Sequence, residues 1–417
     1  MPYNEIFSKV KAASAVLAGY DDATRSRALL NLAHAIDINH DRLLAANARD
    51  LARMDPANPL YDRLQLTSER LDGIVGDMCH VASLPSPLGR NIEARTLANG
   101  LRLRKVSVAY GVVGVVYEAR PNVTFDVFSL CMKSGNACVL KGGKDAEESN
   151  REAIALIHEV LAAEGLCPDI VQLLPATHEA TAAMLGANGY IDVCIPRGGK
   201  RLIQFVRNNA TVPVIETGAG VVHAYFDIKG DTAMGARIIT NAKTRRVSVC
   251  NALDCLIVHS ARLQDLPQLV AQMKENNVEL LADHRAAEVL NGAYPYVKTI
   301  AEEDEDEVMS TEFMDYRMAI KTVDSLDEVL AHIARYGSGH SECIITADTS
   351  AARRFQQAVD AACVYWNAPT SFTDGAQFGL GAEIGISTQK LGPRGPMGLE
   401  ELNTYKWIIE GEGQTRP

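Results

Sequence analysis

The feature that most constrains the fold is a regular alternation of short apolar runs with helix-like stretches between residues 111 and 215. Apolar runs with few polar residues between them are typical of parallel strands buried on both faces. Because helix-like stretches separate the runs, the sequence predicts a doubly wound parallel sheet with ligands at the carboxyl ends of its strands. The predicted strands are Gly111–Tyr117, Ala137–Leu140, Ile170–Leu174, Ile191–Ile195 and Val212–Ile215.

The rest of the chain divides around this sheet. Residues 4–83 carry alanine-rich stripes at helical spacing and are expected to form a helical layer. After Asp227 a second alternating series begins, with helices expected at 233–241, 263–275 and 326–336 and strands at 256–258 and 343–345. The acidic run 301–308 is expected to be a solvated loop. The glycine-rich stretch 372–396 is expected to be a long loop against the site.

Residues 97–108 change the apolar period to two and predict a hairpin. The pair Asn99-Gly100 lies between the two arms and favours a tight turn with positive φ. A two-stranded ribbon is marginally stable by itself and needs something to pack against. An ordinary surface hairpin and a ribbon that contacts another subunit both fit this stretch.

Composition excludes several classes of function. The 417-residue chain is 47% hydrophobic, which suits two or three domains with cores of their own. Its apolar runs are shorter than the roughly 20 residues that span a bilayer. A net charge of −11 argues against a nucleic-acid partner. The nine cysteines show no metal-binding spacing, so no metal is expected, and their odd number favours reduced thiols in the cytoplasm.

One cysteine stands out from the others. Cys250 lies between a run that contains Lys243, Arg245 and Arg246 and an apolar run that resembles a strand. Neighbouring cations lower the pKa of a thiol and favour the nucleophilic thiolate. A buried core cysteine fits the same local pattern equally well. The stretch alone therefore leaves both interpretations open.

Eight motifs, taken in order, resemble the aldehyde dehydrogenase superfamily, and within it the family that reduces γ-glutamyl phosphate. They are GVVGVVYEARPNVTFD, SGNACVLKGG, IPRGGKRLI, VPVIETGAG, NAKTRRVSVCNAL, YGSGHSE, FGLGAEIGISTQKL and RGPMGLEEL. The resemblance implies an α/β fold of the aldehyde dehydrogenase type, with two doubly wound α/β domains and an oligomerisation element made of the hairpin and the C-terminal segment. We expect the cofactor-binding domain at 1–96 and 110–229, the catalytic domain at 230–384 and the oligomerisation element at 97–109 and 385–417.

The resemblance also implies the catalytic residues. Cys250 is expected to be the nucleophile that holds the acyl group as a thioester, because a thiolate suits attack on an acyl phosphate. Asn122 is expected to donate its amide N–H to the developing oxyanion. From the sequence alone, Asn122 could instead be a turn residue after Pro121. Glu216 stands where hydrolytic relatives activate water, and it is expected to act as a base or only as an orienting carboxylate.

NADP(H) is the cofactor that the resemblance implies. The residues assigned to it are Lys141, Gly142, Lys144, Gly198, Gly199, Glu312 and Phe313. Lys144 stands where NAD-preferring relatives tend to carry an acidic residue that would repel a 2′-phosphate, so its positive charge favours NADP(H). The alternative is that Lys144 is merely the solvated start of a helix. The glycine pair at 198–199 would let the backbone approach the cofactor phosphates near a helix N-terminus.

The implied substrate is γ-glutamyl phosphate, a small molecule with two anionic ends. The candidate contacts are Arg246, Arg120 and Lys243, and Arg246 is favoured for the phosphate because a guanidinium can bind it with two hydrogen bonds. The sequence contains no kinase motif, so glutamate 5-kinase, on a separate chain, is the expected functional partner. A cytoplasmic homo-oligomer without a membrane or nucleic-acid partner is expected.

Two rival interpretations stay open. A hydrolytic aldehyde dehydrogenase would use Glu216 to activate water and would release an acid. A non-catalytic binder on the same scaffold would take up the cofactor without turnover. The sequence also departs from the family pattern in several loop positions, which leaves the substrate detail open; these are Val221, Trp366, Pro369 and Gly392-Pro393.

Overall fold

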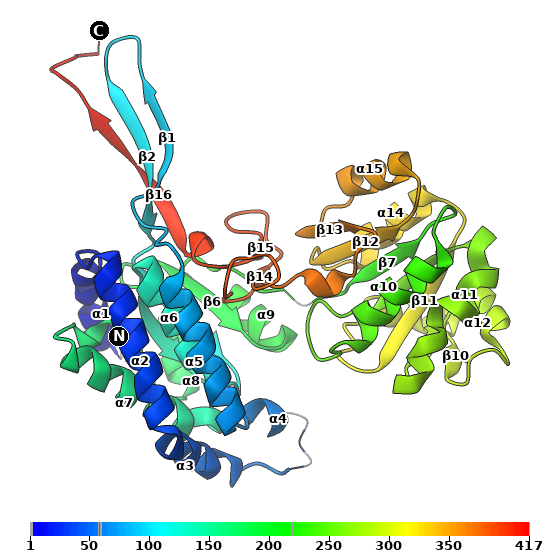
Figure 1. The fold of residues 1–417 in the computed structure, drawn as a ribbon, viewed down its shortest axis with the longest axis horizontal. Helices are drawn as coiled ribbons and strands as arrows, with labels where there is room; N and C mark the ends of the chain where they lie inside the picture. The colour runs from blue at the N-terminus through cyan, green and yellow to red at the C-terminus, as the bar shows by residue number, and fades with distance from the viewer. Residues whose placement is uncertain (1–2, 57, 59–60, 219, 417) are drawn as a thin grey trace. The chain divides into compact units, whose positions relative to one another are not determined.

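The computed structural model describes residues 3–56, 58, 61–218 and 220–416 (Figure 1). They form two compact units, each of which is described by itself. The first unit comprises Met1–Thr217, Gly379–Gly385 and Met397–Pro417, and the second comprises Gly218–Phe378 and Ile386–Pro396. No helix among the described residues combines the length and the apolar character that crossing a membrane requires.

The first unit is built on a four-stranded parallel sheet with the strand order β5-β4-β3-β6. Its strands are β3 (Val112–Tyr117), β4 (Ala137–Lys141), β5 (Val171–Leu173) and β6 (Val193–Arg197). These four strands confirm the predicted ones. The predicted strand at 212–215 is wrong, because only an isolated bridge joins Val214 to Cys194. Pro213 has no N–H to donate, so the ladder does not extend there.

Helices surround this sheet, and those before residue 84 confirm the predicted helical layer. They are α1 (Asn4–Leu17), α2 (Asp22–Ile38), α3 (His40–Leu51), α4 (Tyr61–Leu64), α5 (Ser68–Ser83), α6 (Asn122–Ser134), α7 (Glu147–Ala163), α8 (His178–Leu185) and α9 (Lys200–Asn209). Helix α6 starts at Asn122. Pro121 immediately precedes it with helical backbone angles. Because proline is tolerated where a helix begins, the helix extends back to the end of the preceding loop.

A three-stranded antiparallel sheet forms a separate ribbon within the first unit (Figure 1). Its strands are β1 (Asn91–Thr96), β2 (Arg102–Ala109) and β16 (Asn403–Glu410). The predicted hairpin is confirmed, with Gly100 at a φ of +85° in its turn. Its first arm lies before residue 97, in a stretch that carries no alternating pattern. The C-terminal strand pairs with the free edge of β2 along its whole length.

The second unit contains a seven-stranded parallel sheet with the order β10-β9-β11-β8-β7-β12-β13. Its strands are β7 (His223–Phe226), β8 (Cys255–His259), β9 (Glu279–Ala282), β10 (Val297–Thr299), β11 (Arg317–Val323), β12 (Ser341–Ile345) and β13 (Cys363–Trp366). Its helices are α10 (Thr232–Thr244), α11 (Leu266–Val270), α12 (His284–Leu290), α13 (Glu305–Met309), α14 (Leu326–Tyr336) and α15 (Thr349–Ala358). The unit also has a two-stranded pair, β14 (Ile386–Ser387) with β15 (Gly395–Pro396).

Two expectations for the second unit were wrong. The predicted helix at 263–275 is broken into α11 and a 3₁₀ turn on either side of it. The acidic run is not a loop, because a 3₁₀ turn at Glu302–Asp304 leads into α13. Acidic side chains in the first turn of a helix are stabilised by its dipole, which is why this run is helical despite its charge.

Candidate active site

The predicted nucleophile lies in the short loop between α10 and β8, where the side chain of Cys250 is half-buried. This loop passes directly against Gly220. A Cβ on Gly220 would lie 1.8 Å from the carbonyl oxygen of Cys250, so only glycine fits. The N–H of Gly220 donates to the carboxylate of Glu312 at 3.0 Å. Gly220 therefore joins the predicted nucleophile to a predicted cofactor contact, a role that sequence reasoning missed.

Asn251 anchors the same loop from its other side. Its amide donates to the carbonyl oxygens of Thr373 at 2.9 Å and of Ser371 at 3.4 Å. The hydroxyl of Thr370 donates to the carbonyl oxygen of Asn251 at 3.0 Å. These bonds tie the cysteine loop to the segment that follows β13, and they include the first residues of the stretch predicted to lie against the site.

Two buried titratable groups of the second unit, Asp254 and Lys243, influence each other electrostatically just before β8. Asp254 accepts hydrogen bonds from the backbone N–H groups of Phe313 at 3.0 Å and Val222 at 3.3 Å. Burial raises the pKa of Asp254, and the nearby Lys243 opposes that shift. Burial lowers the pKa of Lys243, whose ammonium lies 5.9 Å from the centre of the Phe313 ring.

Lys243 and Arg246 were both predicted as substrate contacts, and the structure places them differently. Lys243 is fully buried, which favours a supporting role beneath the cysteine loop. Arg246 is exposed in the loop that carries Cys250. A substrate contact of either residue stays a prediction, and the exposed guanidinium of Arg246 is the more accessible of the two.

In the first unit, Asn122 is the first residue of α6, at the carboxyl end of β3. Its amide nitrogen donates to the carboxylate of Asp126, one helical turn further on, at 2.8 Å. Burial raises the pKa of Asp126 to about 7, against the effect of this hydrogen bond. Asp126 thereby orients the predicted oxyanion donor. The signal that sequence reasoning missed is the spacing of four residues, which puts two side chains on the same helix face. Arg120 is half-buried just before α6.

Glu216 forms an ion pair within the first unit. Its carboxylate lies 3.4 Å from the guanidinium of Arg207 on α9, and its side chain is 20% exposed. A carboxylate held in this way suits an orienting role better than the activation of water. Its catalytic role stays a prediction.

The N-terminus of α9, which was predicted to bind cofactor phosphates, already holds an anion from the chain itself. The carboxylate of Glu118 accepts the N–H of Gly199 at 2.8 Å. A Cβ on Gly198 would lie 2.6 Å from the same carboxylate oxygen. Helix N-termini attract anions because their N–H groups are unpaired and the dipole is positive there. A phosphate bound at this end would take the position of Glu118.

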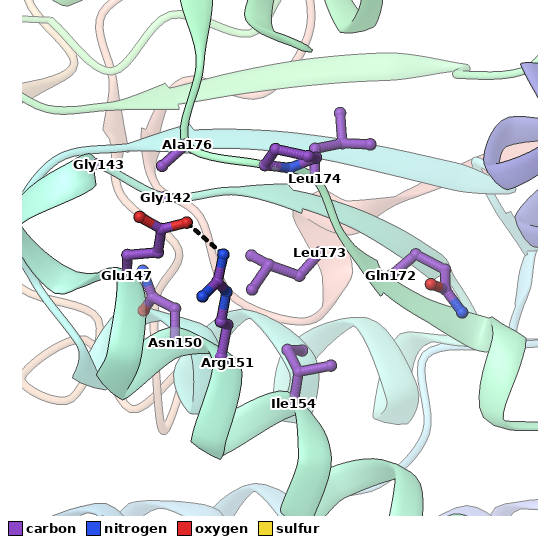
Figure 2. A pocket seen from close by; sticks show the side chains of 11 residues that line it. Gly142, Gly143, Glu147, Asn150, Arg151, Ile154, Gln172, Leu173, Leu174 and Ala176 are labelled. Carbon is purple, nitrogen blue, oxygen red and sulfur yellow. Dashed lines mark hydrogen bonds and ion pairs between the residues drawn. The ribbon is translucent and has the colours of Figure 1, made fainter. Parts of the chain in front are cut away.

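A cavity of about 240 Å³ lies at the carboxyl ends of β4 and β5 (Figure 2). Gly142 and Gly143 form part of its wall, and a Cβ on Gly142 would lie 2.2 Å from the amide nitrogen of Asn150. Figure 2 shows Glu147 and Arg151 on α7, joined by an ion pair of 2.6 Å. Arg151 is a lining cation that sequence reasoning missed.

Two predicted lysines lie beside this cavity wall. Lys141 is half-buried at the end of β4, and burial lowers its pKa. Lys144 is exposed in the 3₁₀ turn that leads into α7. The first unit thus gathers Lys141, Gly142 and Lys144 at one strand end. The second unit gathers Cys250 and Glu312 around Gly220.

Comparisons with known proteins agree with this fold. The aldehyde dehydrogenase family matches residues 233–407. The gamma-glutamyl phosphate reductase of Bacteroides thetaiotaomicron is 58% identical over 413 residues, which are 99% of each chain. The crystal structure of the gamma-glutamyl phosphate reductase of Thermotoga maritima matches with a TM-score of 0.94 at 38% identity, again over 99% of each chain. An engineered glycolyl-CoA reductase, solved with NADP⁺, shares the fold at a TM-score of 0.68 and 15% identity, over 98% of this chain and 96% of that one.

The two α/β units define a protein of the aldehyde dehydrogenase type, which confirms the predicted fold class. The full-length identity is more specific, and the chain belongs to the family of gamma-glutamyl phosphate reductases.

Proposed function

We propose that this chain reduces γ-glutamyl 5-phosphate to glutamate 5-semialdehyde and phosphate with NADPH, the second step of proline biosynthesis from glutamate. The observation that carries the proposal is 58% identity over 99% of the chain to a gamma-glutamyl phosphate reductase. Such identity over the full length supports the same substrate and not only the same fold. Glutamate 5-kinase, as a separate cytoplasmic enzyme, would supply the acyl phosphate.

Cys250 is the proposed nucleophile. Its thiolate attacks the acyl carbon, a C–S bond forms, and the bond between the acyl carbon and the phosphate oxygen breaks, so inorganic phosphate leaves. Asn122 donates an N–H to the oxygen that becomes negative, and Asp126 holds that amide in place. Bound NADPH supplies the hydride for the acyl carbon. Cys250 then leaves as a thiolate and the aldehyde is released.

The residues around the cavity of Figure 2 fit the adenosine end of NADPH. Gly142 lies so close to Asn150 that a Cβ there would collide with it, and the side chains of Asn150 and Gln172 line the cavity with amide groups. Arg151 lines the same cavity, and a guanidinium can bind a phosphate with two hydrogen bonds. Glu147 forms an ion pair with the guanidinium of Arg151. A bound 2′-phosphate would replace the Glu147 carboxylate as the partner of that guanidinium. With Lys144 nearby, this arrangement favours NADPH over NADH.

The cofactor preference is tested by Arg151→Ala and Lys144→Ala, with Lys298→Ala, an exposed lysine of the second unit, as the control. Each cavity variant should lower the ratio of kcat/KM for NADPH to that for NADH about tenfold, because one phosphate contact is lost. The control should leave the ratio unchanged. An unchanged ratio in both cavity variants would remove the structural basis for NADPH preference.

The reaction itself is tested in reverse, with pyrroline-5-carboxylate and NADP⁺, in the presence and absence of inorganic phosphate. Strict dependence on phosphate is expected, because phosphate must resolve the thioester in that direction. Turnover without phosphate would instead support the hydrolytic rival, in which Glu216 activates water. Cofactor binding without turnover under both conditions would support the non-catalytic binder.

The three-stranded ribbon is the proposed oligomer surface. It exposes large apolar side chains, and β1 and β16 each pair along one edge only among the described residues. The exposed side chains are Ile92, Leu97, Tyr405, Trp407 and Ile409. Free strand edges and exposed aromatic groups favour pairing with another copy. The double variant Trp407→Glu with Ile409→Glu should have a lower oligomeric mass in light scattering. An unchanged mass would show that the ribbon is not the interface.

A further inference from the structure

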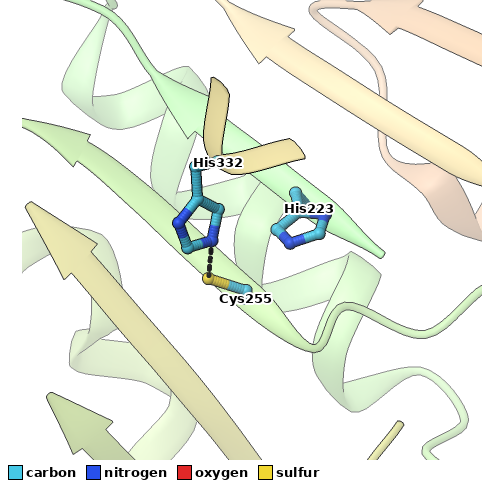
Figure 3. A group of neighbouring side chains, drawn as sticks. All are labelled: His223, Cys255 and His332. Carbon is cyan, nitrogen blue, oxygen red and sulfur yellow. Dashed lines mark hydrogen bonds between the residues drawn. The ribbon is translucent and has the colours of Figure 1, made fainter. Parts of the chain in front are cut away.

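Two histidines and a cysteine meet in the core of the second unit, where β8 begins directly after the cysteine loop. His223 begins β7 and Cys255 begins β8, and the two residues are directly paired in the parallel ladder. Paired residues of neighbouring strands present their side chains on the same face of a sheet. Helix α14 contributes His332, which points at Cys255 (Figure 3). All three side chains are buried, with exposed fractions of 0%, 1% and 7% in chain order.

The distances within this cluster are close to those of a metal site. The thiol sulfur of Cys255 lies 3.8 Å from Nε2 of His332, and one ligand atom from each of the three residues lies within 4.8 Å of the others. Zinc–sulfur and zinc–nitrogen bonds of about 2.3 and 2.0 Å at tetrahedral angles separate sulfur from nitrogen by about 3.5 Å and two nitrogens by about 3.3 Å. A contraction of about 1.5 Å at most would therefore bring the three ligand atoms to zinc-binding distances. The sulfur of Met309 lies 3.9 Å from that of Cys255, as a further soft donor.

His223 is prepared as a ligand by a second buried group. Its Nδ1 is hydrogen-bonded to the carboxylate of Glu342 at 2.9 Å, and Glu342 is fully buried. With ionised Glu342 as the acceptor of this bond, the proton lies on Nδ1 and the lone pair of Nε2 is available to a metal ion. Nε2 is itself buried without a hydrogen-bond partner among the described residues. A carboxylate behind a histidine is the arrangement that orients metal-binding imidazoles, and an unpaired buried nitrogen is costly unless something binds it.

We propose that His223, Cys255 and His332 bind a zinc ion in the second unit. Zinc prefers imidazole nitrogen and thiolate sulfur, the donors present here. Its two positive charges would be balanced by the Cys255 thiolate and the Glu342 carboxylate, so the buried site would be neutral overall. On binding, the Cys255 S–H bond gives up its proton to solvent as the sulfur–zinc bond forms. The ion would link β7, β8 and α14, and it takes no part in the proposed reduction.

Sequence spacing could not show this site. The three residues are far apart in the chain and match no short metal-binding motif, which is why no metal was expected. The strand register brings the first two together, and the packing of α14 adds the third.

The test measures zinc in the full chain, purified from zinc-supplemented cells or refolded with one equivalent of Zn²⁺ and then desalted. Because the site is buried, the refolding route ensures that the ion can enter. We expect about one zinc per chain in the wild type and in Cys250→Ala, and at least a tenfold lower content in Cys255→Ser and His332→Gln. The Cys250→Ala variant separates this site from the proposed catalytic thiol.

Cobalt supplies a second readout, which reports the metal–thiolate bond directly. Co²⁺ refolded into the wild type and into Cys250→Ala should give the near-ultraviolet absorption of a cobalt–thiolate bond. Cys255→Ser, checked for folding by circular dichroism, should lack it. A wild type that retains no zinc by either route, or zinc that is lost in Cys250→Ala and kept in Cys255→Ser, would overturn the proposal.

Discussion

Cys250 and Cys255 lie on one short stretch of chain, yet the structure gives them opposite environments. Cys250 is half-buried in a loop held by Gly220 and Asn251. Cys255 is buried in the apolar face of β8, where burial raises the pKa of its thiol well above the ordinary value. A raised pKa keeps the thiol protonated and unreactive unless a metal ion replaces the proton. The position of the backbone, and not the residue type, therefore decides which cysteine can be a nucleophile.

The largest effect should separate the two cysteines by activity. Cys250→Ala removes the only proposed acceptor of the acyl group and should lower kcat by at least about 10⁴-fold. Cys255→Ser should keep kcat within about threefold, because its side chain does not contact the substrate in the proposed mechanism. Phosphate-dependent NADP⁺ reduction measures both, with NADPH titration to verify folding. Equal losses of kcat in the two variants would show that the two cysteines do not differ in their catalytic role.

Asn122→Ala tests the comparison further. It removes the amide that is proposed to stabilise the oxyanion formed when Cys250 attacks, and Cys255 has no such proposed partner. The loss of one oxyanion donor should lower kcat about 10²- to 10³-fold with little change in KM. Asn188→Ala, at an exposed position of the same unit, is the matched control and should retain full activity. A loss that appears in KM alone would assign Asn122 to substrate binding instead of the transition state.

Gly220→Ala tests whether the position of the loop makes Cys250 reactive. The added Cβ would collide with the carbonyl oxygen of Cys250, so the loop must shift. A displacement of about 1 Å can cost about 10²-fold in rate, and a kcat 10- to 100-fold lower is therefore expected. Gly73→Ala in α5, where a Cβ would contact nothing within 4 Å, is the control. Full activity in Gly220→Ala would show that the loop tolerates displacement.

The smallest expected effect concerns Asp126, a carboxyl group whose pKa is raised by burial, as is the pKa of the Cys255 thiol. The folded-state pKa of Asp126 is about 7, above its ordinary value of 3.8, so the folded protein binds this proton more tightly than the unfolded one. The associated stability is present at pH 4 and is lost as pH rises through 7. Asp126→Asn cannot ionise, so its stability relative to the wild type should rise by about 2–3 kcal/mol between pH 5 and pH 8. Thermal unfolding midpoints at the two pH values measure this, and a pH-independent difference would contradict the assigned pKa.

Local patterns predicted much of the fold. The buried runs that became β3 and β4 have no polar alternation, and Gly165, at a φ of +71°, lies just after the end of α7. The motif around Cys250 indicated the proposed nucleophile, whose role stays a prediction. The strand at 212–215 and the loop at 301–308 were wrong because a missing N–H and a helix dipole outweighed local composition.

The supporting residues of the candidate site escaped prediction for a different reason. No local sequence pattern marks these residues as part of a site. They are Glu118, whose carboxylate accepts the N–H of Gly199 before α9, Arg151, which lines the cavity, and Asp254, which accepts the N–H of Phe313. Each acts through a contact with a residue that the sequence does not place beside it. The sequence also did not show that Lys243 is buried, since a lysine near two other cations suggests exposure.

By itself, the sequence determined the class of fold, the family and the identity of the proposed nucleophile, because these depend on short-range periodicity and on motifs that keep their order. Only the tertiary structure decided which side chains are buried and which meet. His223, Cys255 and His332 illustrate the difference, since strand register and helix packing alone bring them within 4.8 Å. Burial and proximity set the pKa of each group and the ligands within its reach, and both arise from contacts between distant parts of the chain.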